Sequence, residues 1–343
     1  MQLSILDQSI VRPGSDARAA FAETLALARH AERLGYERFW VSEHHDSPVI
    51  AGSSPEVLLA AIGAATTTIR IGSGGVMLPH YSAYKVAENF AVLSNLYPGR
   101  VDLGVGRAPG ADMNAAIALA ADGRPKFERF PQLLRTLTEA LWNPAFRPRV
   151  GPVPAGQIPV WVLGTSPDSA LLAAELGLPY AVALFINPQF DPRIVEAYRS
   201  RFRPSPLQPE PRVMIAMNAF CADDEAHAAT MTRAADITYI RFLTQRGEIA
   251  MCSPEDAAQH VFSPEEHAFV QGVSRVRAVG TPQTIRARVT QLATQFHADE
   301  VMAVCNSFHF ADRLRSFELL AEAYGLQRTA PATGEVAAPP PDR

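Results

Sequence analysis

The feature that most constrains the fold is an alternation of short apolar runs with longer amphipathic runs over most of the 343 residues. Eight apolar runs have the length and composition of buried strands. They span residues 3–9, 38–43, 69–76, 101–107, 158–164, 179–185, 212–221 and 300–306. Each is followed by a run with helical periodicity, at residues 16–34, 54–68, 82–96, 127–142, 168–176, 193–202, 224–242 and 310–324.

Strands that alternate with helices build a parallel sheet. Eight such units fit an α/β fold that closes into a single (β/α)8, or TIM, barrel. An open doubly wound sheet is the alternative, because periodicity does not distinguish the two. One additional helix is predicted at residues 282–296, after a long irregular stretch at 244–277, so we expect an insertion before the last strand. The barrel is expected to occupy residues 1–325 as one domain.

Composition excludes several other classes of protein. The formal net charge of -4 gives no general attraction to nucleic acid, and the apolar runs are too short to span a membrane. The first residues lack the basic and apolar segments of a signal peptide, and the three cysteines make neither a disulfide framework nor a zinc site. We therefore expect a cytoplasmic protein. Residues 326–343, with three consecutive prolines, are expected to form a disordered tail.

In a TIM barrel the active site lies at the C-terminal ends of the strands. The Glu43-His44-His45 run stands at the end of the second predicted strand. Two adjacent histidines on an extended chain point to opposite sides, so only one of them faces the barrel mouth. A metal site would need ligands from several strands, which the sequence does not offer. A histidine that acts in catalysis and a structural histidine remain the two interpretations. Gln8 and Asn306 also stand at strand ends, where ordinary entry into a loop explains a polar residue equally well.

Glycines end the third predicted strand at Ser73-Gly74-Gly75. Glycine allows the backbone to approach a flat ligand closely, although a simple β-bulge explains it as well. The fourth strand ends at Arg107, within Gly104-Val105-Gly106-Arg107. This segment is not a dinucleotide-binding fingerprint, because that motif belongs to the first strand and opens directly into a helix. The Arg107 guanidinium suits a phosphate or a carboxylate partner.

A turn rich in hydroxyl groups follows the fifth predicted strand. It contains Thr165 and Ser166, with Ser169 in the first turn of the next helix. Hydroxyl and N–H groups at a helix N-terminus form a site for anions, whereas capping of the helix by Ser166 is the simpler function. Because this turn and Arg107 lie on neighbouring strands, one phosphate could contact both.

Taken in order, these segments resemble the bacterial-luciferase-like family of flavin-dependent monooxygenases. The matching segments are Glu43 to His45, Ile71 to Pro79, Gly99 to Arg107, Val162 to Ala170 and Val279 to Pro282. The resemblance covers residues 1–325 and implies a TIM barrel with FMN at its C-terminal mouth. It further implies that reduced FMN arrives from a separate flavin reductase, reacts with O2 to a C4a-peroxyflavin and oxidises a small organic substrate.

By this resemblance His44 is the catalytic imidazole, and the Gly74–Gly75 peptide bond is cis. The residues implied to contact the cofactor are Glu43, Ser73, Gly74, Gly75, Arg107, Thr165, Ser166 and Ser169. Gly106 stands where the light-emitting family member has cysteine, which argues against luciferase activity itself. The expected apolar substrate pocket includes Leu6, Met77, Phe185 and Met217.

The resemblance leaves two other functions open. A deazaflavin (F420)-dependent oxidoreductase uses a similar barrel mouth, and some relatives bind flavin without catalysis. The family also pairs subunits through the second and third barrel helices. Small residues at Ala60, Ala61, Gly63, Ala64 and Ala65 would let a partner helix approach, so we expect a homodimer.

Overall fold

Eight parallel strands close into a barrel in the computed structural model, which describes residues 1–107, 110, 112–120, 122–205, 207–244 and 249–327. The barrel strands are β1 (Gln2–Asp7), β2 (Arg38–Val41), β3 (Arg70–Met77), β4 (Val101–Gly106), β5 (Val160–Leu163), β6 (Tyr180–Ala183), β7 (Val213–Cys221) and β9 (Glu300–Val304). Pairing of β6 with β7 and of β1 with β9 completes the ring. The predicted TIM barrel is confirmed, and the open sheet is excluded.

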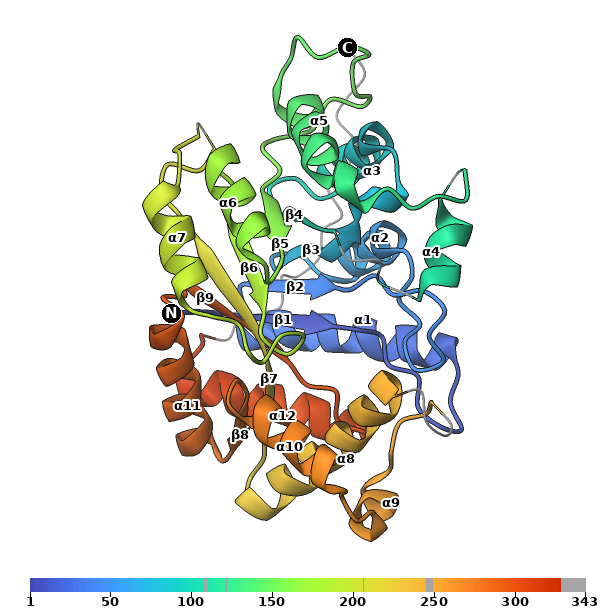
Figure 1. Ribbon diagram of the computed structural model, residues 1–343, viewed down its shortest axis with the longest axis vertical. Helices are drawn as coiled ribbons and strands as arrows, with labels where there is room; N and C mark the ends of the chain where they lie inside the picture. Colours follow the sequence, from blue (N-terminus) through green and yellow to red (C-terminus); the bar gives the residue numbers. More distant parts are fainter. Residues whose placement is uncertain (108–109, 111, 121, 206, 245–248, 328–343) are drawn as a thin grey trace.

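Helices surround the barrel, as Figure 1 shows. They are α1 (Ala17–Leu34), α2 (Pro55–Ala65), α3 (Ala83–Leu96), α5 (Phe130–Trp142), α6 (Pro167–Leu176), α7 (Arg193–Arg201), α8 (Glu225–Thr244), α11 (Pro282–Gln295) and α12 (Phe310–Tyr324). Local signals set their ends. For α1, the Asp16 side chain accepts a hydrogen bond from the Ala19 amide, and Gly35 ends the helix in the left-handed region. The main apolar core lies between this layer and the outer faces of the strands.

The stretch at 244–277 is more regular than the sequence suggested. It contains α9 (Pro254–Gln259) and α10 (Pro264–Ser274), and it leads into β8 (Ala278–Gly280), which pairs with β7 outside the barrel. Each of these two helices begins after a capping serine and has a proline in its first turn, so the sequence contained the signals that start a helix. The segment after β4 likewise holds α4 (Met113–Leu119), capped by Asp112. The part of the expected tail at residues 328–343 lies outside the described residues.

Two tryptophans fill the middle of the barrel. Trp40 on β2 and Trp161 on β5 meet edge to face, with ring centroids 5.6 Å apart, and both are buried. A Cβ atom at Gly72 would lie 2.5 Å from the Trp40 indole nitrogen, so glycine on β3 makes room for this ring. The barrel is therefore closed in its interior, and a ligand has space only at its ends.

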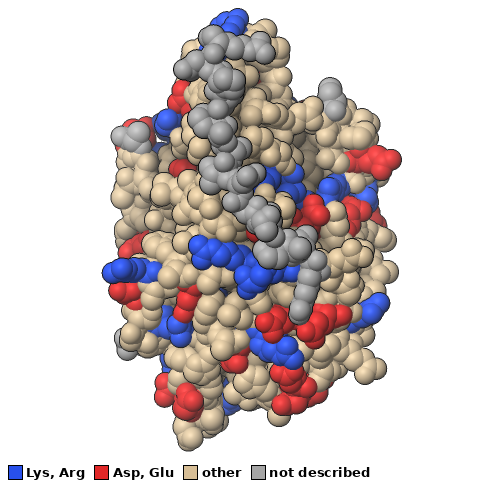
Figure 2. All heavy atoms as spheres, turned by 180° about the vertical axis from the view of Figure 1, so that it is seen from behind, with Lys and Arg blue, Asp and Glu red and all other residues tan. Residues whose placement is uncertain are grey.

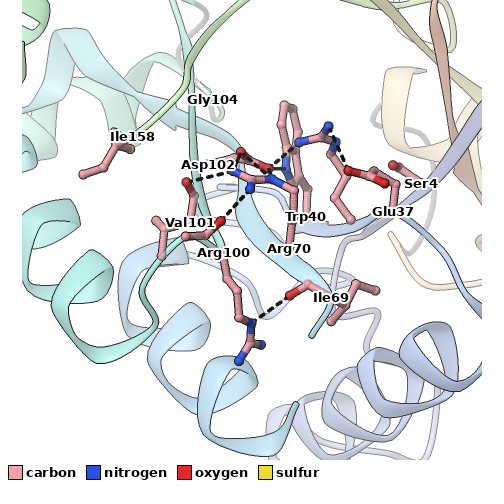
Figure 3. Close-up of polar contacts among 12 residues, drawn as sticks. Ser4, Glu37, Trp40, Ile69, Arg70, Arg100, Val101, Asp102, Gly104 and Ile158 are labelled. Atoms are coloured by element: carbon pink, nitrogen blue, oxygen red, sulfur yellow. Dashed lines mark hydrogen bonds and ion pairs between the residues drawn. The ribbon is translucent and has the colours of Figure 1, made fainter. Parts of the chain in front are cut away.

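Charged residues seal the N-terminal end of the barrel. The Arg38 guanidinium lies between Asp102 and Glu300, 2.6 Å from an oxygen of each. Arg70 pairs with Asp102, and Arg212 pairs with Glu300 at 2.8 Å. Figure 3 shows Arg70 against Asp102 beside Trp40. Burial alone would raise the pKa of Asp102, but Arg38 and Arg70 hold it below its ordinary value.

Charges of both signs are mixed on the part of the surface that Figure 2 shows. This mixture is in keeping with the small net charge. Within the described ranges, every helix is too short or too polar to cross a bilayer.

Candidate active site

The residues predicted from strand ends come together at the C-terminal mouth of the barrel. Strands β2 and β4 end at Val41 and Gly106, somewhat earlier than the sequence predicted. Glu43, His44 and Arg107 therefore lie in the loops just beyond the strands. In Figure 1 the N-terminus lies on the opposite side of the barrel from α4, which follows β4 at this mouth.

The Glu43 carboxylate is buried and anchors the loop after β2. It accepts hydrogen bonds from His45 Nε2 at 2.8 Å, from the Met77 amide at 2.9 Å and from the Tyr81 hydroxyl at 2.8 Å. Burial and this carboxylate both raise the pKa of Tyr81. His45 is therefore held by Glu43, and a cofactor contact for Glu43 remains a prediction. Tyr81 was not anticipated, since nothing in the sequence marks it.

Whereas His45 contacts Glu43, the His44 side chain contacts Gln8, just after the end of β1. Its Nε2 atom lies 3.3 Å from the side-chain nitrogen of Gln8, and Asn306, after β9, donates to the Gln8 carbonyl oxygen. Burial lowers the pKa of His44 below its ordinary value of 6.5, although the neighbouring Glu43 carboxylate opposes this. The ring is thus neutral at pH 7. It lines a cavity of about 430 Å³ together with His45, Asp46 and Ser47.

The end of β3 provides a bare backbone beneath the mouth. The Gly74–Gly75 peptide bond is cis, which confirms the expectation from the family resemblance. A Cβ atom at Gly75 would lie 2.7 Å from the Gly104 carbonyl oxygen, and one at Gly74 would lie 2.8 Å from a Leu6 methyl carbon. Only glycine fits these two positions without movement of its neighbours.

Ser73 connects β3 to β4 at the point where their register shifts. Its hydroxyl donates to the Gly104 carbonyl at 2.8 Å and accepts from the Gly104 amide at 3.1 Å. The side chain is fully buried. Ser73 therefore supports the glycine backbone, and a direct cofactor contact for it remains a prediction.

Arg107 and the turn after β5 lie side by side. Gly106 is in register with Leu163, so Arg107 stands level with Gly164, next to Thr165. The guanidinium is exposed and has no ion pair or hydrogen bond with any described residue. The alternative in which Arg107 pairs with a carboxylate of this chain is therefore not observed in the described ranges.

Ser166 and Ser169 cap α6 as the simpler interpretation predicted. The Ser166 hydroxyl accepts from the Ser169 amide at 3.3 Å, and the Ser169 hydroxyl accepts from the Ser166 amide at 3.3 Å. Ser169 also lies 3.2 Å from the hydroxyl of Tyr180, whose pKa is raised to about 12 by burial. Thr165 makes no hydrogen bond through its hydroxyl within the described ranges. A phosphate contact for these three residues remains a prediction.

One residue of the expected apolar pocket was assigned to the wrong side of its strand. Leu6 and Phe185 belong to the cluster inside the barrel, and a place for them in the pocket wall remains a prediction. Met217 instead belongs to the core between strands and helices. Side chains alternate along a strand, and Met214 and Ala216 are the residues of β7 that point inward. Met217 therefore does not line the mouth.

The arrangement contains no metal-binding cluster. Within the described ranges, histidine, cysteine, aspartate and glutamate nowhere form a group of three or more that could hold an ion. The mouth instead combines a neutral imidazole, a glycine backbone and a guanidinium that has no partner within the described part of the chain. This set suits a flat ligand that carries an anionic group.

The chain belongs to the luciferase-like monooxygenase family, whose pattern it matches over residues 1–299. It is 44% identical to the uncharacterized protein YwcH of Bacillus subtilis over 94% of this chain and 99% of that one. It is 34% identical to the N-acetyl-S-alkylcysteine monooxygenase of the same organism, over 94% and 98% of the two chains. The crystal structure of apo-MsnO8 superimposes with a TM-score of 0.86 at 36% identity, covering 96% and 99%.

Two more distant solved structures share the fold and carry different cofactors. The oxygenating constituent of 3,6-diketocamphane monooxygenase from Pseudomonas putida, in complex with FMN, has a TM-score of 0.72 at 20% identity, covering 96% of this chain and 99% of that one. An F420-dependent secondary alcohol dehydrogenase has a TM-score of 0.68 at 15% identity, covering 95% and 99%. The structural neighbours thus bind flavin or deazaflavin.

Proposed function

We propose that the protein is a two-component flavin-dependent monooxygenase, which uses reduced FMN from a separate reductase and O2 to oxidise a small apolar organic molecule. The observation that supports this most is Arg107, which has no partner among the described residues and lies beside the Thr165–Ser166 turn, at the same barrel mouth as His44. The family includes monooxygenases, and one solved neighbour binds FMN. The proposal places the enzyme in the cytoplasm, with a single catalytic domain over residues 1–325.

The residues present fit FMN. Arg107 would hold the phosphate, because a guanidinium offers paired donors to its oxygens. The Thr165 hydroxyl, and that of Ser166 after a rotation, would add donors at the N-terminus of α6, where the helix dipole favours an anion. The glycine backbone at Gly74–Gly75 would receive the flat ring system. When bound, reduced FMN would supply the electrons that activate O2.

His44 has the properties of a proton-transfer residue in this mouth. Its ring is half-buried and neutral at pH 7, so it can accept a proton or donate one through its N–H group. The apolar side chains Leu6 and Phe185 below the mouth would limit the access of water to the reacting groups. They also favour an apolar substrate.

Replacement of Arg107 tests the phosphate site. We expect Arg107→Ala to weaken FMN binding by roughly 10- to 100-fold, because a hydrogen bond to a charged group contributes about 1.5–3 kcal/mol. Riboflavin has no phosphate and should lose little affinity. Arg107→Lys keeps the charge without the paired donors, so its affinity for FMN should lie between those of the wild type and Arg107→Ala. Flavin fluorescence titrations measure both ligands, with the exposed Arg135→Ala on α5 as the control. An equal loss for FMN and riboflavin would show that Arg107 does not hold the phosphate.

The proposal extends to a homodimer through α2 and α3. Val57 on α2 and Val92 and Leu96 on α3 are exposed large apolar residues, and Ala61 and Ala64 are exposed on the same face of α2 as Val57. Gly63, which we expected on this surface, instead packs against the Tyr97 ring, so it serves the contact between α2 and α3.

Charged substitutions on this face test the dimer. We expect sedimentation of the wild-type protein at twice the monomer mass and of the double variant Val57→Glu, Leu96→Glu at the monomer mass, because the new carboxylates would be buried without partners. Val261→Glu serves as the control for surface charge, because Val261 is exposed and follows α9, outside the α2–α3 face. A monomeric wild-type protein at micromolar concentration would contradict the proposal.

A further inference from the structure

Three strand ends are connected by side-chain amides at the barrel mouth. Gln8 follows β1, Asn306 follows β9, and His44 follows β2. We propose that Gln8 is a positioning residue that fixes the tautomer of His44, with the proton on Nδ1, and that Asn306 fixes the orientation of Gln8. The consequence for catalysis rests on the proposed function; the tautomer itself does not.

The direction of the hydrogen bonds that run from Asn306 through Gln8 to His44 follows from donor and acceptor chemistry. The Asn306 amide nitrogen, which can only donate, faces the Gln8 carbonyl oxygen. Gln8 therefore presents its own amide nitrogen, again only a donor, to His44 Nε2 at 3.3 Å. Two donors cannot form a hydrogen bond with each other, so Nε2 must be the unprotonated nitrogen of the ring. A neutral imidazole then carries its proton on Nδ1.

The barrel holds all three residues in place. Gln8 and Asn306 continue the β1–β9 register, in which Ile5 faces Ala303, and Gln8 is buried. The His44 amide donates to the Gly52 carbonyl at 2.8 Å, which fixes the backbone beneath the ring.

This arrangement also disfavours the charged form of His44. Protonation at Nε2 would bring two donors face to face, and rotation of the Gln8 amide would bring its nitrogen against that of Asn306. The charged and titratable groups that act on the ring are Glu43, which favours the cation, and His45, which opposes it. The amide chain adds to burial in keeping the ring neutral with an N–H group at Nδ1.

Asn306→Asp should reverse the chain of hydrogen bonds. A carboxylate only accepts, so the Gln8 amide would turn its nitrogen toward it and its oxygen toward His44. Gln8→Glu should have the same effect on the ring, because the new side chain has no donor. In both variants we expect the neutral ring to carry its proton on Nε2 and the pKa of His44 to rise by about one unit. Gln8→Leu should leave a mixture of tautomers.

Nitrogen-15 NMR of the imidazole rings in the cofactor-free protein tests this directly. The His44 signals are assigned with His44→Gln, and circular dichroism checks that each variant is folded. We expect an unprotonated Nε2 in the wild type at neutral pH and a protonated Nε2 in Asn306→Asp. Asn187→Asp, at the end of β6, adds the same charge without contact to Gln8 and should leave the tautomer unchanged.

Two results would overturn the proposal: a protonated Nε2 in the wild-type protein, or a folded Asn306→Asp variant with the wild-type tautomer and only a raised pKa. The second result would show a simple effect of charge. If the protein is an FMN-dependent oxygenase, Asn306→Asp should also lower kcat by about 10²–10⁴-fold with little change in KM, as is typical of a catalytic histidine in the wrong tautomer. The NMR result stands whether or not FMN binds, so the two proposals fail separately.

Discussion

Replacement of His44 by alanine is expected to lower coupled oxygenation by about 10²–10⁴-fold while the fold and the affinity for FMN change little, the usual loss for a missing acid–base group. The ring lines a cavity formed by the loop after β2 and forms a hydrogen bond with the Gln8 side chain, whereas Glu43 provides the contacts that hold the loop. Oxygen consumption compared with peroxide release measures the coupling. Because burial lowers the pKa of His44, the acid limb of the wild-type pH–rate profile should lie below pH 6.5.

His45→Ala is the matched control for this variant. His45 donates one of the three hydrogen bonds that Glu43 accepts, so its loss should cost about 1–3 kcal/mol of stability and only a modest part of the activity. Equal losses of activity in the two variants would contradict the assignment of His44 as the catalytic residue.

Arg38→Ala is expected to reduce the free energy of unfolding by about 3–5 kcal/mol, because it leaves two buried carboxylates without their shared partner. Asp102 and Glu300 would each keep one arginine, Arg70 and Arg212, at the rim of the cluster. Urea denaturation followed by circular dichroism measures the change. The exposed pair of Arg135 and Glu175 offers the control, since Arg135→Ala should change stability by less than about 0.5 kcal/mol.

The same cluster predicts a loss of stability in acid. The pKa of Asp102 is lower in the folded state than in the unfolded chain, so the ionised carboxylate stabilises the fold above its unfolded pKa. That contribution disappears as the pH falls through the folded pKa.

If Arg38→Ala and the wild type unfolded at the same urea concentration, the cluster would contribute nothing to stability.

Most of the barrel could be predicted from the sequence because buried parallel strands are rich in apolar residues on both faces. The eight runs and the caps of the long helices carried enough signal to place them. Strand ends were less certain, since Glu43 and Arg107 continue the apolar runs without being in the ladder. The helices α9 and α10 were missed because each buries a single apolar residue, Ala257 and Val273, and so gives little periodic signal, although each begins with Ser-Pro-Glu.

Site residues could be predicted where a residue type has few structural roles, as glycine does. They could be predicted less well where the role of a residue depends on which atoms it contacts in the fold. The adjacent glycines at Gly74 and Gly75 indicated either a close approach to a flat ligand or a β-bulge; the structure shows a register shift there and no room for side chains, and the approach to a ligand stays a prediction. Met217 was assigned by its type alone, without the alternation that points it outward. The roles of Gln8 and Asn306 depend on which atoms face each other across β9, β1 and β2, and a sequence does not contain that information.

Anaerobic titration of the purified protein with reduced FMN distinguishes an FMN-dependent enzyme from the alternatives. Oxidised FMN, riboflavin and F420 are titrated in parallel under the same conditions. The proposed site at Arg107 and Thr165 predicts that reduced FMN binds with one molecule per chain and at least about tenfold more tightly than riboflavin, because only FMN offers the phosphate. Tighter binding of F420 than of reduced FMN, or no binding of any flavin, would contradict a monooxygenase that depends on FMN.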